Sequence, residues 1–215
     1  MTSIIITVRG RQSHLVKTVE SVIAETNSEI IVVHMNQPAS YAHPRVISAE
    51  ISSETDLCVA KARNYGAQLA SSDTLIFLDV DCFVQPGFVE NYVKHRSETK
   101  IVMGRCFYEP TLYEHSKRNT LMKPTWELFW SLSFMIERSL FNKLGGFDEQ
   151  FVGYGVEDTD FAYRAYKAGV KFEWAPWAMC VHQYHEPSKQ VFAESFALNQ
   201  KRFQIKHPEL SEIHG

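Results

Sequence analysis

The 215-residue sequence contains no apolar run that approaches the ~18 residues needed to cross a bilayer as a helix. It enters an apolar stretch directly after Met1-Thr2-Ser3, without the basic and apolar regions of a signal peptide. We therefore expect a soluble, cytoplasmic protein. Peripheral contact of an exposed face with a membrane or a partner stays open.

Clusters of positive charge and closely spaced cysteines are also missing. The formal net charge is -3 and there is no Lys/Arg-rich run, which argues against nucleic acid as a partner. No Cys-x-x-Cys pair occurs, so neither a disulfide framework nor a zinc knuckle is indicated. We expect the dispersed cysteines to be reduced thiols of the core: Cys58, Cys82, Cys106 and Cys180.

Hydrophobic residues make up 45% of the chain, enough for the core of one α/β domain, and no linker, repeat or low-complexity tract divides it. Ser3–Val8 and Glu29–Met35 are continuous apolar runs typical of buried parallel strands. Between them a helical pattern starts at Ser13, a plausible N-cap. This alternation predicts a parallel βαβ unit.

The rest of the chain continues the alternation. We predict helices at Asp56–Leu69, Phe88–His95 and Arg138–Leu144, an irregular segment at Glu109–Thr125, and an amphipathic helix within Ser188–Gly215. Strands are predicted at Arg45–Ala49, Thr74–Leu78, Ile101–Tyr108, Ser133–Ile136, Phe172–Ala175 and Ala178–Val181. The predicted fold class is α/β, with an open, mixed, mostly parallel sheet flanked by helices.

Two carboxylates, Asp79 and Asp81, follow the strand Thr74–Leu78. Residues two apart on an extended chain point to the same side, so the two side chains can converge on one object. A hard divalent cation prefers a few carboxylate oxygens and completes its shell with water and substrate phosphates. Alternatively, the two acids only end the strand before the turn at Pro86-Gly87.

Polar residues also follow the neighbouring predicted strands. Arg9 comes after the first strand and Asn36 after the second. In open α/β sheets, ligands bind beyond the carboxyl ends of the strands. Because Arg9, Asn36, Asp79 and Asp81 all fall there, the sequence predicts a ligand site at this edge of the sheet.

A second acidic cluster begins at a Gly-aromatic-Gly loop around Tyr154 and continues into a predicted helix with Glu157, Asp158 and Asp160. Acids in a first helical turn complement the helix dipole and cap free amides, which accounts for one or two of them. A Glu-Asp pair beside a glycine-rich loop also suits a general base held over a bound hydroxyl.

Two histidines, His182 and His185, follow the last predicted strand. One histidine at a strand end is most often structural. Two at i and i+3, in a chain that also offers an Asp-x-Asp, favour metal coordination by neutral imidazole. No His-Glu-x-x-His helix is present, which argues against a zinc hydrolase.

With these motifs placed, the chain resembles nucleotide-sugar glycosyltransferases of the GT-A fold, in particular the family 2 enzymes and the galactosyltransferase-type region shared with polypeptide N-acetylgalactosaminyltransferases. The resemblance rests on Ile4–Arg9, Ala62–Ala67 with Leu78–Asp81, Gly145–Glu149, Gly153–Asp160 and His182–His185. It implies a single, Rossmann-like GT-A domain over residues 1–215. The implied parts are a nucleotide-binding half at 1–100, an acceptor and catalytic half at 101–187, and a C-terminal helix and tail at 188–215.

The resemblance implies a hexosyltransferase that moves a sugar from a nucleoside-diphosphate sugar, expected to be a UDP-sugar, to a hydroxyl of a glycan, lipid-linked or small-molecule acceptor. It assigns Mn²⁺ or Mg²⁺ to Asp81 and His185, with Asp79 and His182 as further ligands. The general base of the inverting family matches Asp158, and the neighbouring Glu157 matches the residue that orients the acceptor.

The other implied contacts are spread along the chain. For the nucleotide, diphosphate and ribose they are Thr7, Arg9, Asn36, Arg63 and Asp79; for the sugar or acceptor they are Tyr154, Trp130 and Trp126. The chain departs from the family 2 pattern at His34-Met35-Asn36, where an acid is usual. This departure leaves the identity of the nucleotide base open.

Two other functions fit parts of the sequence. A nucleotidyltransferase would ordinarily have a Gly-rich, Lys-bearing phosphate loop after the first strand, and Arg9-Gly10-Arg11 is a poor version of one. A catalytically silent sugar- or nucleotide-binding module need not retain Asp81, Asp158 and both histidines together. For the C-terminal helix, docking on the core is favoured over membrane binding.

Overall fold

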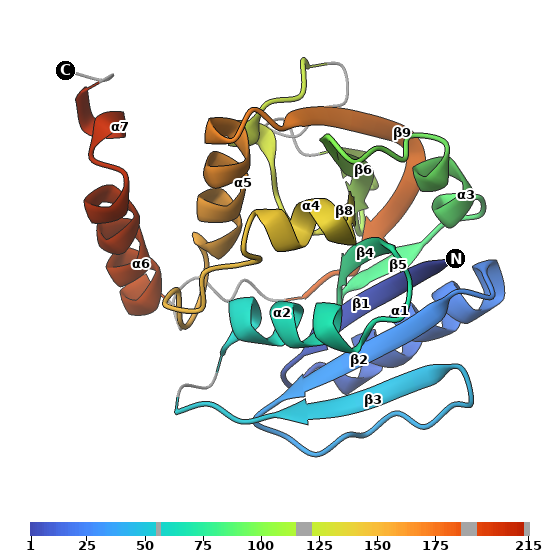
Figure 1. Cartoon of the computed structure of the whole chain (residues 1–215). Coiled ribbons are helices and arrows are strands. Elements are labelled where there is room, and N and C mark those ends of the chain that lie inside the picture. The colour runs from blue at the N-terminus through green and yellow to red at the C-terminus, as the bar shows by residue number, and fades with distance from the viewer. Residues whose placement is uncertain (55–56, 115–121, 186–192, 213–215) are drawn as a thin grey trace.

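One continuous sheet runs through the computed structural model, in the order β3-β2-β1-β4-β8-β6-β9-β5, with β7 paired to β6 (Figure 1). The structure describes residues 1–54, 57–114, 122–185 and 193–212. The sheet is mixed and flanked by helices, as predicted. The proposed division of the chain into a nucleotide-binding half and an acceptor half stays a prediction.

The first four strands in sequence are parallel and lie side by side. They are β1 (Thr2–Val8), β2 (Glu29–Met35), β3 (Val46–Ile51) and β4 (Thr74–Asp79). Helix α1 (Gln12–Glu25) covers one face of β1, and α2 (Val59–Leu69) covers the other. This two-sided cover explains why these strands are apolar almost throughout rather than alternating.

The second part of the sheet continues from β4 through an antiparallel partner, β8 (Ser133–Glu137). The other strands are β5 (Cys82–Val84), β6 (Lys100–Tyr108), β7 (Tyr113–Glu114) and β9 (Lys171–His182). The flanking helices are α3 (Phe88–Val93), α4 (Arg138–Lys143), α5 (Glu157–Lys167) and the 3-10 turn η2 (Trp126–Leu128). Stacked phenylalanines fill the space between α5 and the sheet.

The last described helices, α6 (Ala193–Lys206) and α7 (Glu209–Glu212), lie beside α5 (Figure 1). Phe203 packs edge-on against Tyr163, and His207 Nε2 lies 2.8 Å from the buried carboxylate of Asp160. The predicted docking of the C-terminal helix on the core is therefore observed for residues 193–206. Within the described ranges, the model contains no helix with the length and apolarity of a membrane span.

Three predicted boundaries were wrong or incomplete. Helix α1 begins at Gln12 with Arg11 as its N-cap, so Ser13 lies inside the helix and caps nothing. The two strands predicted at 172–175 and 178–181 form one strand, β9. The predicted start of the helix at Asp56 lies outside the described residues, and α2 begins at Val59.

Candidate active site

The carboxyl ends of β1 and β4 and the end of β9 meet at one edge of the sheet. Thr7 on β1 pairs in register with Asp79 on β4, and Cys82 on β5 pairs with His182 on β9. The backbone of Asp81, between β4 and β5, accepts a hydrogen bond of 2.7 Å from the N–H of Gln183. Strand pairing thus brings Asp81 next to a histidine that lies a hundred residues further along the chain.

Asp81, His182 and His185 form one cluster. Asp81 Oδ1 lies 3.5 Å from His182 Nε2, and Oδ2 lies 3.4 Å from His185 Nε2. The Asp81 side chain is only 6% exposed. Burial alone would raise its pKa, but a hydrogen bond from His185 and the charges of His182 and Arg11 hold the pKa of Asp81 below its usual value. The carboxylate is therefore ionised and ready to bind a cation.

The donor atoms of these three side chains suit a divalent cation. One ligand atom from each of Asp81, His182 and His185 lies within 4.8 Å of the others. Imidazole nitrogens combined with a carboxylate suit Mn²⁺ better than Mg²⁺, because Mg²⁺ prefers an all-oxygen shell with several waters. Asp79, the other predicted ligand, is not part of this cluster of described residues and instead forms an ion pair.

The partner of Asp79 is Arg63, a buried arginine on α2. Arg63 Nη2 donates to Asp79 Oδ1 at 3.0 Å, and Nη1 donates to Glu157 Oε1 at 2.9 Å. Burial alone would lower the pKa of Arg63, but the charges of Asp79 and Glu157 raise it, so the guanidinium stays charged. Arg63 thus joins the Asp-x-Asp motif to the Glu-Asp pair, which lie far apart in sequence.

Glu157 and Asp158 have different environments although they are neighbours. Glu157 is 7% exposed. Burial, and then the charge of Asp158, raise its pKa to about 7 against the opposing effect of Arg63. Asp158 is half-buried, and its oxygens accept hydrogen bonds from the N–H of Thr159 at 2.8 Å and of Ser131 at 3.4 Å. Glu157 is bound to the positively charged guanidinium of Arg63, whereas the hydrogen bonds of Asp158 come from neutral groups.

The glycine-rich loop that precedes α5 is held by helix α6. Asn199 on α6 is 2% exposed, and its amide donates to the carbonyls of Val152 at 3.0 Å and Gly155 at 2.9 Å. Gly153 and Gly155 both have positive φ, and an added Cβ at either position would collide with a side chain of α6. Helix α6 therefore fixes the loop, and with it the start of α5.

The remaining predicted site residues lie around this centre. Tyr154 is 41% exposed, and its backbone N–H donates to Ser195 Oγ at 3.1 Å. Arg9 directly follows β1. Asn36 has a φ of 48°, and its side-chain oxygen accepts a hydrogen bond of 2.7 Å from the N–H of Ser53, which joins the end of β2 to the segment after β3. The functions predicted for these residues stay predictions.

The two predicted acceptor tryptophans lie at and beside η2. The ring of Trp126 packs against Tyr163 on α5 at a centroid distance of 4.9 Å, and it also approaches Tyr166. Trp130 follows the turn and is half-buried, directly before Ser131, which donates to Asp158. Of the two tryptophans, Trp130 is the one whose neighbour in sequence, Ser131, donates a hydrogen bond to the candidate base Asp158. Contact of either ring with an acceptor stays a prediction.

Sequence patterns gave no role to Arg11, Asn199 or a group of buried thiols. The sulfur atoms of Cys82, Cys106 and Cys180 lie within 4.8 Å of one another, and none of the three forms a disulfide, as predicted for reduced core cysteines. Hydrogen bonding with the other two thiols, together with burial, raises the pKa of Cys82 well above its usual value. The Cys82 thiol is therefore protonated, and all three thiols are buried in the core. The αL backbone of Arg11 could not be read from the sequence.

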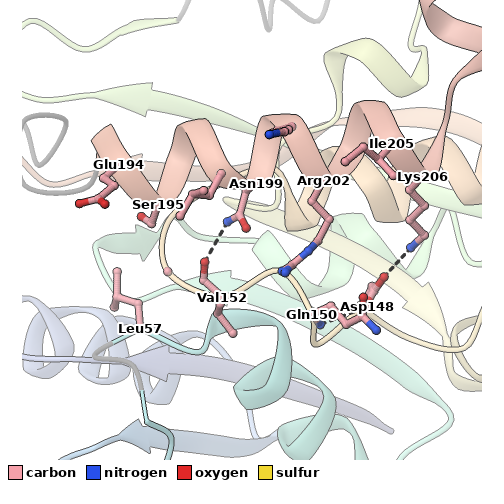
Figure 2. Close-up of a pocket in the computed structure, with 13 residues that line it drawn as sticks. Leu57, Asp148, Gln150, Val152, Glu194, Ser195, Asn199, Arg202, Ile205 and Lys206 are labelled. Carbon is pink, nitrogen blue, oxygen red and sulfur yellow. Dashed lines mark hydrogen bonds and ion pairs between the residues drawn. The ribbon is translucent and has the colours of Figure 1, made fainter.

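A cavity of about 1010 Å³ lies between α6 and the loop that follows α4 (Figure 2). Its lining includes Leu57, Val152, Asn199 and Lys206, and the dashed lines in Figure 2 join Asn199 to Val152 and Lys206 to Asp148. None of the candidate metal ligands or the Glu-Asp pair lines this cavity. This cavity is thus adjacent to the glycine-rich loop and separate from the candidate metal ligands.

A family model described as glycosyl transferase family 2 matches residues 3–160. The chain belongs to this family. The match includes the Asp-x-Asp motif, Arg63 and the Glu-Asp pair, and it ends before His182 and His185. The family match therefore covers the Asp-x-Asp motif, Arg63 and the Glu-Asp pair, and any role of the two histidines must be argued from their geometry.

Among curated relatives, the chain is similar to a validoxylamine A glucosyltransferase of Streptomyces hygroscopicus subsp. jinggangensis, with 28% identity over 71% of this chain and 45% of that protein. It is also similar to human polypeptide N-acetylgalactosaminyltransferase 6, with 25% identity over 94% of this chain and 40% of that protein. The chain thus spans less than half the length of either relative.

Solved structures with this fold include GalNAc-T7 with UDP, GalNAc and Mn²⁺, with a TM-score of 0.68 and 19% identity, covering 97% of this chain and 50% of that one. Another is a mannosyltransferase from Pyrobaculum calidifontis with GDP-Man and Mn²⁺, with a TM-score of 0.70 and 16% identity, covering 97% of this chain and 64% of that one. At these identities the likeness establishes the GT-A fold alone.

Proposed function

We propose that the chain is a metal-dependent, inverting glycosyltransferase that moves a sugar from a nucleoside-diphosphate sugar to an acceptor hydroxyl. Asp81, His182 and His185 hold the divalent cation, and Asp158 is the general base. The observation that carries this proposal is the linkage through Arg63. One guanidinium binds Asp79, beside the metal cluster, and Glu157, beside the base.

The assignment of the base to Asp158 rather than Glu157 follows from their surroundings. Glu157 is buried and hydrogen-bonded to Arg63, with a pKa of about 7. A carboxyl group in that position is buried and holds Arg63. Asp158 is more accessible than Glu157, and the N–H of Thr159 at the start of α5 donates to it at 2.8 Å.

The reaction can be written with these residues. The acceptor hydroxyl gives its proton to Asp158 as its oxygen attacks the anomeric carbon of the donor. The bond from that carbon to the diphosphate oxygen breaks on the opposite face, and its electron pair leaves with the diphosphate. A bound divalent cation would neutralise the departing phosphates. No covalent sugar-enzyme intermediate is required.

The proposed donor is a UDP-sugar, with the base to be established by experiment. Of the two similar structures, one contains UDP and the other GDP-mannose, each with Mn²⁺. We therefore propose a thermal-shift screen of UDP, GDP and CDP, with and without Mn²⁺. One nucleotide should stabilise the protein only when the metal is present. A silent nucleotide-binding module without a metal site would show no dependence on Mn²⁺.

Two substitutions separate binding from chemistry. Asp81→Ala should abolish metal-dependent nucleotide binding, because it removes the only carboxylate of the cluster. Asp158→Asn should preserve that binding. It should lower the rate of sugar transfer, or the rate at which the enzyme hydrolyses the donor, by about 100-fold or more. Glu90→Gln, on the surface of α3, is the matched control for loss of a carboxylate. Near-normal turnover by Asp158→Asn would remove Asp158 from the role of base.

A further inference from the structure

The guanidinium of Arg11 makes contacts with two of the three proposed metal ligands. Arg11 Nη1 forms an ion pair with Asp81 Oδ2, and Nη2 lies 3.4 Å from His185 Nδ1. Asp81 Oδ2 is also the oxygen that faces His185 Nε2. The same carboxylate oxygen is thus shared between an arginine of this chain and the imidazole that would complete a metal site.

The backbone places Arg11 there at a cost. Residue 11 has φ 53° and ψ 40°, the left-handed region, at the N-cap of α1. For a residue with a Cβ this conformation is unfavourable, and such strain is often found at functional sites. Gly10, with φ 63°, precedes it. The tight turn from β1 into α1 brings the side chain of residue 11 beside Asp81, 70 positions further along the chain.

Exposure differs between the two partners. The side chain of Asp81 is 6% exposed and that of Arg11 is 30% exposed. A carboxylate so deeply buried needs a positive partner. Arg11 can leave toward solvent, whereas Asp81 cannot. A divalent cation bound to Asp81 would lie within a few ångströms of the guanidinium, where like charges repel strongly. Arg11 and the cation are therefore alternative partners of Asp81.

We propose that Arg11 competes with the divalent cation for Asp81 and, once displaced, binds the diphosphate of the donor. This inference rests on the metal centre of the proposed function. The planar guanidinium suits phosphate oxygens, and a diphosphate arriving with the cation offers Arg11 a new anionic partner. Metal alone then binds weakly, and metal and nucleotide strengthen each other's binding by the same factor.

The test is Arg11→Gln, measured by calorimetric titration in two steps. First Mn²⁺ alone is titrated into the protein; then UDP, and separately GDP, are titrated at saturating Mn²⁺. We expect Arg11→Gln to bind Mn²⁺ alone about tenfold more tightly than the wild type and the nucleotide about tenfold more weakly. Lys17→Gln is the matched control, because Lys17 is a cation on the same helix that pairs with Glu109.

A second variant, Arg11→Lys, keeps the positive charge but lacks the pair of parallel N–H donors of a guanidinium. It should leave the affinity for Mn²⁺ alone near the wild-type value and weaken nucleotide binding less than Arg11→Gln does. Circular dichroism and urea unfolding of each variant verify that the fold is intact before titration.

The outcomes separate this inference from the proposal on which it depends. Opposite changes in metal and nucleotide affinity in Arg11→Gln, absent from Lys17→Gln, support the competition. If the wild type shows metal-dependent nucleotide binding that Asp81→Ala abolishes, but Arg11→Gln weakens both affinities or neither, the metal centre stands and the role of Arg11 is wrong. If the wild type binds no Mn²⁺ with either nucleotide, both are wrong.

Discussion

Replacing Glu157 by glutamine should change how the stability of the protein depends on pH. The pKa of Glu157 is raised from 4.5 to about 7, chiefly by burial and next by the charge of Asp158. A carboxyl group whose pKa is higher in the folded state stabilises the fold in its protonated form. That contribution is complete below pH 4.5 and is lost as the pH rises through about 7.

The size of the effect follows from the shift. Each pKa unit corresponds to about 1.4 kcal/mol, and part of the loss has already occurred at pH 5, so the change between pH 5 and pH 8 is about 2–3 kcal/mol. Glu157→Gln keeps a neutral side chain of the same shape and does not titrate. The free energy of unfolding of the wild type, relative to that of the variant, should therefore fall by this amount across the interval.

Urea unfolding at pH 5 and pH 8, followed by circular dichroism, measures both free energies directly. Other acids titrate in both proteins, so the difference between the two proteins isolates Glu157. Glu127→Gln, an exposed carboxyl in η2, should retain the wild-type dependence on pH. Parallel pH curves for the wild type and Glu157→Gln would refute the assignment of a proton to Glu157 in the buried pair with Arg63.

Three further substitutions test how the structure supports the site. Asn199→Ala should unfold about 1–3 kcal/mol more easily and lower kcat while nucleotide affinity is retained, because the buried carbonyls of the 152–155 loop lose their donor. Gly104→Ala should cost about 1–3 kcal/mol in urea unfolding, since its Cβ would lie 2.8 Å from the carbonyl oxygen of Ala178. Arg138→Ala should cost about 2–4 kcal/mol, because its guanidinium binds three carbonyls at the end of α2 and beyond, yet turnover by the folded enzyme should be unchanged.

The parallel half of the sheet could be predicted because burial on both faces leaves an unambiguous pattern. Strands β1, β2 and β4 are apolar over nearly their whole length and are 0–8% exposed apart from their ends. The course of β9 was harder to predict. Pro176 has no N–H for a sheet ladder, so two strands were expected. The register with β6 shifts there, from Gly104 opposite Ala175 to Arg105 opposite Met179, and this shift admits the proline within one strand.

The site could be predicted in part. The positions of Asp81 and His182 follow from where strands end, and strand ends are readable in the sequence. Arg63 was expected near the diphosphate, but its two carboxylate partners come from elements whose packing the sequence does not encode locally. Arg11 gave no signal, because its left-handed backbone at a helix start is uncommon for arginine.

Arginines explain how this site can hold so many acids. Four carboxylates, Asp79, Asp81, Glu157 and Asp158, lie at one edge of the sheet, and repulsion among them would raise their pKa values if they were left unpaired. Arg63 binds two of them and Arg11 binds a third. The carboxylate without an arginine partner among these contacts is Asp158, the proposed base. Pairing thus engages three of the acids with arginines and leaves Asp158 for the acceptor's hydroxyl, and the same pairing makes Asp81 the position where we propose that a cation displaces an arginine before the donor binds.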